Sequence, residues 1–254
     1  MKVTILGAGT AIPSLDYSPA SILLQSGTAD ALIDFGPGAL QKAAQAGIDY
    51  INLDTVFLTH LHSDHTLDLI TFLQANDSNP TEKRTTPLQV YGCVGTKAWY
   101  KKLMEAFPGI SPSTYSFAIA EIKQYVWTWR ELQVSSILTG HTETSLAYRF
   151  EGNEGSFVFT GDAVLSNDLF EFCANADLLI CECSFPSGWV SQDHMTADKV
   201  GLLAKTAAVK HIAVTHQYSP ALAVDIFSQI AESYSGKITI AKDGSSFTIQ
   251  KGIK

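Results

Sequence analysis

The stretch that decides the fold runs from Thr55 to Asp68 and reads TVFLTHLHSDHTLD. Its apolar run, Val56-Phe57-Leu58, has the character of a buried strand. Directly after that run come four residues that bind metals in many proteins, namely His60, His62, Asp64 and His65. Imidazole and carboxylate are the usual ligands of zinc and related divalent ions. The spacing therefore predicts a metal site at the end of this strand.

Geometry divides these four residues into two pairs. Residues two apart in an extended segment point the same way, so His60 and His62 can converge on one ion. Asp64 and His65 follow at the entry to a helix and can face a second ion. Further ligands must come from elsewhere, and three candidates each follow an apolar strand: His141 after SILTG, Asp162 after SFVFTG and His216 after HIAVT. A set of capping or surface histidines is the alternative, but it does not account for this repeated position at strand ends.

His194 lies in the segment DHMTADKVG, just before a predicted N-cap at Thr196. We expect its imidazole to lie near the metals and to donate a proton to a leaving group. The alternative is an exposed loop histidine.

Composition narrows the class of protein. With 254 residues, 46% hydrophobic and 17% charged, the chain can bury a large core. The formal net charge of −8 disfavours broad attraction to nucleic acid. The start, MKVTILGAGTAIP, lacks the features of a signal peptide. No apolar run reaches the ~20 residues that a membrane helix needs. The four cysteines form no C-x-x-C pair. We therefore expect a soluble cytoplasmic protein with buried, reduced thiols.

Hydrophobic periodicity predicts strands and helices in two similar halves, each with several strands followed by strand–helix units. Near the C-terminus it predicts a helix over Ala221–Ser233, then a closing hairpin of Lys237–Ala241 with Ser246–Gln250. We expect residues 1–254 to form a single domain of two sheets covered by helices.

The segment THLHSDH resembles the signature of the metallo-β-lactamase superfamily. The later segments GHTETSLAYRF, FVFTGDA, ADLLICECSF, DHMTADKVG and VTHQYSP occur in the order of its ribonuclease Z-like branch, whose members process tRNA 3′ ends or cleave other phosphodiesters. The resemblance spans nearly the whole chain and is far more specific for superfamily than for substrate. It implies an α/β fold, a four-layer αββα sandwich with two metal ions at one edge.

When the candidate residues are matched to the family motifs, the resemblance implies a role for each of them. His60, His62 and His141 would hold one ion, and Asp64, His65 and His216 the other. Asp162 would bridge the two ions. His194 matches the histidine of the H-x-T-A motif that acts in proton transfer, and Asp64 would also orient the nucleophile or accept its proton. Zinc is the expected metal, with manganese and iron as alternatives.

Two departures from ribonuclease Z bear on the substrate. Those enzymes carry a long, basic, glycine-rich arm that grips tRNA, usually between the positions that match His141 and Asp162. Here the interval from Thr142 to Gly161 reads as two strands and a turn, which leaves no room for the arm. Asp68 also replaces the glycine that usually follows the motif. The chain therefore looks like an armless relative, which argues against tRNA processing.

The sequence thus predicts a dinuclear metal-dependent hydrolase, a phosphodiesterase in which a metal-bound hydroxide attacks phosphorus. Its expected partner is a small phosphodiester or nucleotide-like substrate rather than extended nucleic acid or a membrane. Superfamily relatives are frequently dimers, so a homodimer is compatible with the resemblance.

Several alternatives remain open at this point. The same metals could hydrolyse a carboxyl ester, thioester or lactone, or the protein could be a tRNA 3′-processing endonuclease. Three further alternatives rank lower. The later motifs disfavour hydrolysis of β-lactams, and His62 disfavours iron-dependent redox chemistry with a flavin partner. The complete ligand set disfavours a non-catalytic binding scaffold.

Overall fold

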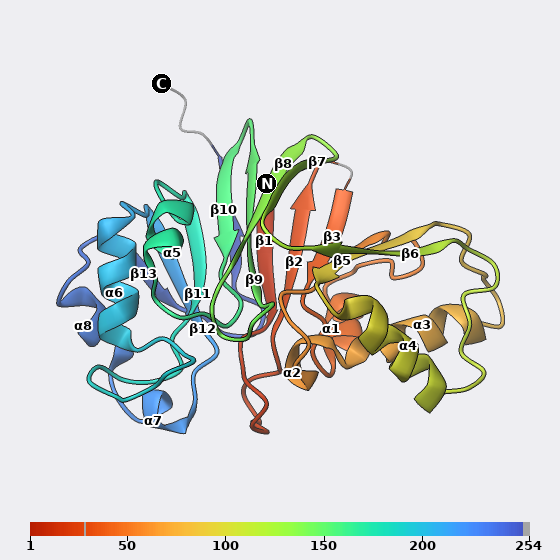
Figure 1. Cartoon of the computed structure of the whole chain (residues 1–254), viewed down its shortest axis with the longest axis horizontal. Helices are drawn as coiled ribbons and strands as arrows, with labels where there is room; N and C mark the ends of the chain where they lie inside the picture. Colours follow the sequence, from red (N-terminus) through yellow and green to blue (C-terminus); the bar gives the residue numbers. More distant parts are fainter. Residues whose placement is uncertain (28, 251–254) are drawn as a thin grey trace.

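The computed structural model describes residues 1–27 and 29–250, and its backbone forms two mixed β-sheets flanked by helices (Figure 1). The first sheet contains β1 (Lys2–Gly7), β2 (Ser21–Ser26), β3 (Ala29–Ile33), β4 (Thr55–Phe57), β5 (Leu88–Cys93), β6 (Phe117–Ile122) and β14 (Ser246–Thr248). The second contains β7 (Tyr125–Trp129), β8 (Leu132–Leu138), β9 (Leu146–Gly152), β10 (Gly155–Phe159), β11 (Leu178–Glu182), β12 (His211–Thr215) and β13 (Lys237–Ile240). The helices are α1 (Ala39–Gln45), α2 (Ser63–Thr66), α3 (Asp68–Ser78), α4 (Thr96–Ala106), α5 (Asn167–Phe172), α6 (Ala197–Thr206), α7 (Ser219–Leu222) and α8 (Ile226–Ala231).

The two sheets have matching strand orders, β14-β1-β2-β3-β4-β5-β6 and β13-β12-β11-β10-β9-β8-β7. Strands β3 to β6 are parallel neighbours in the first sheet, and β10 to β13 are parallel neighbours in the second. Parallel strands end at the same edge of a sheet, so the loops that follow them gather there.

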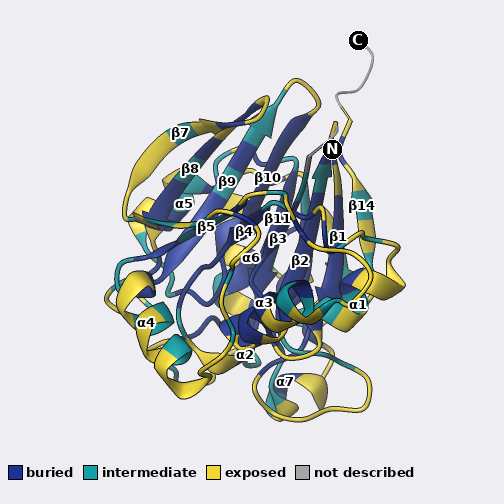
Figure 2. Cartoon of the chain, turned by 90° about the vertical axis from the view of Figure 1, so that its right-hand side faces the viewer, coloured by how far each residue is buried: buried dark blue, intermediate teal, exposed yellow. Residues whose placement is uncertain are grey.

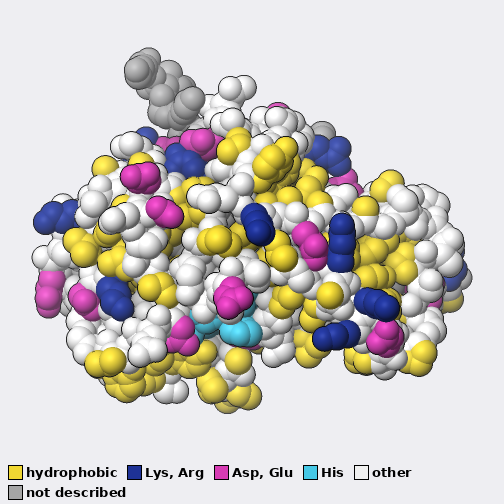
Figure 3. Space-filling view, viewed as in Figure 1, with side chains coloured by type: hydrophobic (Ala, Val, Ile, Leu, Met, Phe, Trp, Pro, Cys, Tyr) yellow, Lys and Arg dark blue, Asp and Glu magenta, His cyan; other side chains and the backbone are white. Residues whose placement is uncertain are grey.

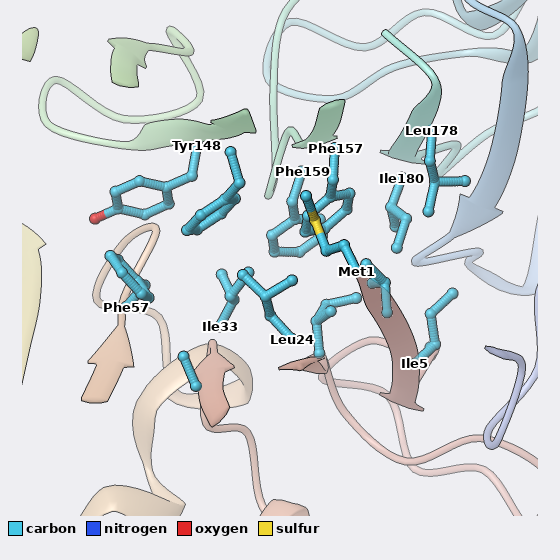
Figure 4. Packing of buried hydrophobic residues seen from close by; sticks show 14 of the residues in the cluster. Met1, Ile5, Leu24, Ile33, Phe57, Tyr148, Phe157, Phe159, Leu178 and Ile180 are labelled. Carbon is cyan, nitrogen blue, oxygen red and sulfur yellow. The ribbon is translucent and has the colours of Figure 1, made fainter. Parts of the chain in front are cut away.

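Apolar side chains fill the space between the sheets (Figure 4). Phe57 of β4 packs against Tyr148 and Phe150 of β9, with ring centroids 5.4 and 5.1 Å away. Helices α1, α3 and α4 cover the outer face of the first sheet, and α5, α6 and α8 cover that of the second (Figure 1). Alternating strand residues are therefore buried on both faces, as the dark central strands of Figure 2 show. This is the four-layer arrangement expected from the sequence.

Most predicted elements are present, but the predicted C-terminal hairpin is wrong. Strand β13 lies parallel to β12 in the second sheet, whereas β14 pairs antiparallel with β1 in the first sheet. The segment between them crosses from one sheet to the other. Asp243, in this crossing, accepts hydrogen bonds from the backbone N–H groups of Ala8 and Ser18, at 3.0 and 2.9 Å.

The predicted helix over Ala221–Ser233 is instead divided into α7 and α8. Asp225 starts the second helix, because its side chain accepts a hydrogen bond from Ser228 N at 3.1 Å. Aspartate is favoured at this N-cap position, where it satisfies a backbone N–H that has no partner within the helix.

The four cysteines are buried and form no disulfide with one another, as expected. Among the described residues, no helix combines the length and apolar character that crossing a bilayer requires.

Arg84 is fully buried and binds backbone carbonyls in place of a carboxylate. Its guanidinium donates to the carbonyl oxygens of Ile51 and Leu53 at 2.9 and 2.6 Å and lies over the rings of Phe72 and Tyr115. We expect Arg84→Ala to lower the free energy of unfolding by about 3 kcal/mol or more, because buried carbonyls lose charged donors. Urea denaturation measures this change.

The matched control is Arg130→Ala, which removes an exposed ion pair with Asp54. Exposed pairs contribute about 0–1 kcal/mol. Equal losses in the two variants would contradict the structural role assigned to Arg84.

Candidate metal centre

The sequence motif lies where β4 ends, and contacts from the opposite sheet fix its backbone. Tyr148 Oη donates to Leu58 O at 2.9 Å, and Leu146 N donates to Thr59 O at 2.9 Å. Gly36 packs so closely against this segment that a Cβ there would lie 2.1 Å from Asp64 O. The loop that carries the predicted ligands is therefore held by both sheets.

The structure brings the predicted ligands together in two adjoining groups. One group holds His60, His62, His141 and Asp162, and the other holds Asp64, His65 and His216. Strands β8, β10 and β12 run in the same direction, so His141, Asp162 and His216 reach the site from the same sheet edge. Histidine side chains that reach the surface on this face gather in one place on its lower part (Figure 3).

The first group has the spacing of metal ligands. His60 Nε2 and His141 Nε2 lie 3.0 and 3.2 Å from His62 Nδ1. Nitrogen ligands at about 2.0–2.1 Å from a tetrahedral zinc ion lie about 3.3 Å apart. Burial, followed by the neighbouring His65, holds the pKa of His60 well below its usual value. That imidazole therefore stays neutral, which is the form that binds a metal.

Asp162 faces both groups. Its Oδ2 lies 3.8 Å from His60 Nε2 and 3.6 Å from His141 Nε2, whereas its Oδ1 lies 3.5 Å from both His65 Nε2 and His216 Nε2. Burial raises the pKa of Asp162, but His216, His65 and His60 together lower it by more, so that the pKa lies well below the usual range. The carboxylate is thus ionised between the two sets of imidazoles.

Two buried atoms support a metal at this position. His65 Nε2 and Asp162 Oδ1 have no hydrogen-bond partner among the described residues, although both are enclosed by protein. Buried polar atoms almost always have a partner. A divalent ion would satisfy both atoms, so the residues present fit the metal that the motif implies.

Asp34, which sequence reasoning missed, orients His65. His65 Nδ1 donates to Asp34 Oδ2 at 2.7 Å, and the backbone N and Oγ1 of Thr59 donate to the same carboxylate at 2.8 Å. This leaves His65 Nε2 free to face the metal position. Asp34 has φ of 59°, which ends β3 two residues earlier than predicted. An acid at the end of the apolar run ALIDFG was the available signal.

We expect Asp34→Asn to weaken metal binding about 10- to 100-fold, because a carboxamide orients His65 less well and makes its Nε2 a less basic ligand. Competition with a chromogenic chelator measures the affinity. Asp30→Asn, on the same strand, is the control, since the Asp30 side chain hydrogen-bonds only to Gln25 in the described part of the chain. Equal affinity in the Asp34 variant would contradict this orienting role.

His194 reaches the site from the loop before α6. Its Nδ1 donates to both carboxylate oxygens of Glu182 at 3.0 Å, and its ring lies 4.7 Å from that of His141. Burial lowers the pKa of His194, but the hydrogen bond to Glu182 and the negative charges of Glu182, Asp162 and Asp193 together outweigh burial and raise the pKa to about 9. His194 is therefore partly buried rather than an exposed loop residue. Thr196 does precede α6, although its side chain makes no capping hydrogen bond.

Glu182 is the second residue that sequence reasoning missed. It is buried, and it also accepts hydrogen bonds from Ala163 N at 2.7 Å and from the hydroxyl of Ser184. A lone acid inside the apolar strand ADLLICECSF was the signal, because a buried carboxylate needs several donors nearby.

Hydrogen bonds to nearby backbone explain the roles of Asp68 and His216 in the fold around the site. Asp68 accepts a hydrogen bond from Leu40 N at 2.7 Å and so supports the first turn of α1, which has no acidic residue of its own. His216 adopts φ of 56°, and its N–H donates to Ala8 O at 2.8 Å. A non-glycine residue in this conformation costs of order 1–3 kcal/mol and is often found at functional sites.

Fold and site together define a metal-dependent hydrolase of the metallo-β-lactamase superfamily, in its ribonuclease Z-like branch. The family model described as anti-Pycsar protein Apyc1 matches residues 1–243, and the chain belongs to that family.

Individual relatives agree with this placement. The chain is 27% identical over 251 residues to the probable metallo-hydrolase YhfI of Bacillus subtilis, covering 96% of this chain and 98% of that protein. It is 28% identical over 270 residues to ribonuclease Z of Mycobacterium marinum, covering 96% of each. The crystal structure of YhfI matches with a TM-score of 0.85 at 26% identity, covering 97% of this chain and 98% of that one. A diphosphatase of the PhnP family has the same fold, with a TM-score of 0.77 at 19% identity over 98% of each chain.

Proposed function

We propose that this protein is a dinuclear metal-dependent phosphodiesterase that cleaves a small phosphodiester. The observation that carries the proposal is Asp162, whose two oxygens face separate sets of imidazoles, beside the His194–Glu182 pair. Metal ligands alone would suit many hydrolases. A protonated imidazole next to them suits the expulsion of an alkoxide.

Each residue has a part in the proposed reaction. His60, His62, His141 and Asp162 would hold one ion, and Asp64, His65, His216 and Asp162 the other. Bound divalent ions supply Lewis acidity and lower the pKa of water toward ~7. Asp64 would orient the attacking water or accept its proton. His194, kept protonated by Glu182, would donate from Nε2 to the leaving oxygen.

The local fold supports a small substrate. Strands β9 and β10 are joined directly at Asn153–Glu154, so the interval between His141 and Asp162 forms a tight hairpin. A tRNA-gripping arm has no place within this interval. The similarity to ribonuclease Z still makes tRNA 3′ processing the second candidate.

The test is hydrolysis of bis(p-nitrophenyl) phosphate by metal-free protein reloaded with zinc or manganese. We expect metal-dependent turnover that His62→Ala abolishes. Precursor tRNA, a thioester and a lactone are assayed in parallel. No phosphodiester turnover with either metal, despite two ions bound per chain, would overturn the proposal, and cleavage of precursor tRNA would favour the second candidate.

A further inference from the structure

Tyr218 lies beside the metal centre but belongs to neither ligand group. It follows His216 at the end of β12, and its backbone N–H donates to Ser184 O at 3.2 Å. Its ring centroid is 5.6 Å from the ring of His216 and 5.7 Å from that of His194. The phenol thus lies next to one predicted metal ligand and next to the predicted proton donor.

A stack of aromatic rings fixes the position of Tyr218. Phe185 lies between Tyr218 and Trp189, with ring centroids 5.5 and 5.3 Å away and interplanar angles of 9° and 5°. Phe185 is itself held by hydrogen bonds between its backbone and the loop of His194, including Ala197 N to Phe185 O at 3.0 Å. A ring held in this way loses little conformational entropy when its hydroxyl makes a new contact.

The hydroxyl of Tyr218 has no hydrogen-bond partner among the residues that the structure describes, although the side chain is partly buried. Its oxygen is not among the fully buried atoms that lack a partner, so it is accessible from outside the protein. A ligand bound beside His216 and His194 can therefore reach the hydroxyl.

We propose that Tyr218 is a further catalytic residue, whose hydroxyl donates a hydrogen bond to a non-bridging oxygen of the phosphoryl group under attack. The proposal rests on the phosphodiesterase function proposed above. The tyrosine proton stays on its oxygen throughout, and no bond to Tyr218 forms or breaks. Phe185 and Trp189 are positioning residues, because they act through the Tyr218 ring.

Tyr218→Phe removes only the hydroxyl and keeps the aromatic stack. We expect kcat to fall about 10- to 100-fold, since one donor to charge that develops in the transition state commonly contributes at this scale or above. KM should change little, and metal content should not change. The matched control is Tyr234→Phe, because Tyr234 Oη donates to Val209 O at 2.8 Å within the helical layer that covers the second sheet. The control should keep the kcat of the wild type.

The stack is tested separately. We expect Trp189→Ala to lower kcat by a smaller factor than Tyr218→Phe, without changing metal content. Trp189→Phe, which keeps a ring against Phe185, should restore most of the lost rate. A merely structural effect would instead appear as lower thermal stability or lower metal content in both variants. Equal rates for Trp189→Ala and the wild type would overturn the positioning role.

Binding of orthovanadate, which adopts five-coordinate geometry at phosphoryl-transfer sites, separates this proposal from the function on which it rests. Isothermal titration calorimetry of the metal-loaded protein should show weaker vanadate binding for Tyr218→Phe, by about the factor seen in kcat. If the wild type turns over phosphodiesters, and Tyr218→Phe has the same kcat and the same vanadate affinity as the wild type, only the role of Tyr218 is overturned. No phosphodiester turnover, but vanadate binding that weakens in Tyr218→Phe, would overturn the function and support the contact. If the protein shows no turnover and binds no vanadate, both proposals are overturned.

Discussion

Asp162→Ala is expected to lower kcat/KM on a phosphodiester by at least about 1000-fold and to reduce the metal content of the protein. Asp162 presents one oxygen to each set of imidazoles, so its loss affects both metal positions at once. Lewis-acid stabilisation by bound metals contributes several kcal/mol, and a loss of about 4 kcal/mol corresponds to about 1000-fold in rate. Metal content is measured by plasma mass spectrometry alongside the kinetics.

The control for Asp162→Ala is Asp168→Ala, which removes an exposed carboxylate from α5 and makes the same change in net charge. It should retain both metals and full activity. Asp162→Asn separates shape from ligand chemistry, since the carboxamide fills the same space but is a weaker bridging group. Full activity of a metal-replete Asp162→Ala protein would contradict the bridging role.

His194→Ala is expected to slow the cleavage of substrates with poor leaving groups about 100-fold or more, which is the usual contribution of a general acid. A p-nitrophenolate leaving group needs little protonation, so its release should slow much less. The measurement is kcat for a series of phosphodiesters whose leaving groups differ in pKa. The dependence on leaving-group pKa should be steeper in the variant. An unchanged dependence, with metals retained, would contradict proton donation by His194.

The pH profile tests the partner of His194. The pKa of His194 is lowered by burial but raised to about 9 by its carboxylate neighbours, Glu182 foremost, so the imidazole is protonated below that pH and loses its proton as the pH rises through it. Activity on poor leaving groups should therefore fall only above about pH 9 in the wild type. In Glu182→Gln the fall should move down toward the ordinary imidazole pKa of about 6.5. Coincident profiles for the two proteins would show that Glu182 does not support the charge of His194.

The candidate ligands could be read from the sequence because their signals are local. Each is a histidine or aspartate placed just after an apolar run, and the end of a strand is where a side chain can leave the sheet and meet others at the edge. The structure places all seven predicted ligands within two adjoining groups for this reason.

The residues that support the ligands could not be found in the same way. Asp34 and Glu182 act through contacts with His65 and His194, which are far from them in sequence. Each was visible only as an acid in an apolar run. What such an acid does depends on which donors the fold brings to it.

Residue types and strand ends are encoded locally, and for this reason the superfamily, the layered architecture and the chemistry of the candidate ligands could be inferred without a structure. The three-dimensional packing was needed to show that β13 and β14 join different sheets, that Asp162 faces both groups of imidazoles, and that Tyr218 stacks against Phe185 beside the site. Strand pairing and side-chain contacts of this kind join segments distant in sequence, and the packing of the whole chain selects among them.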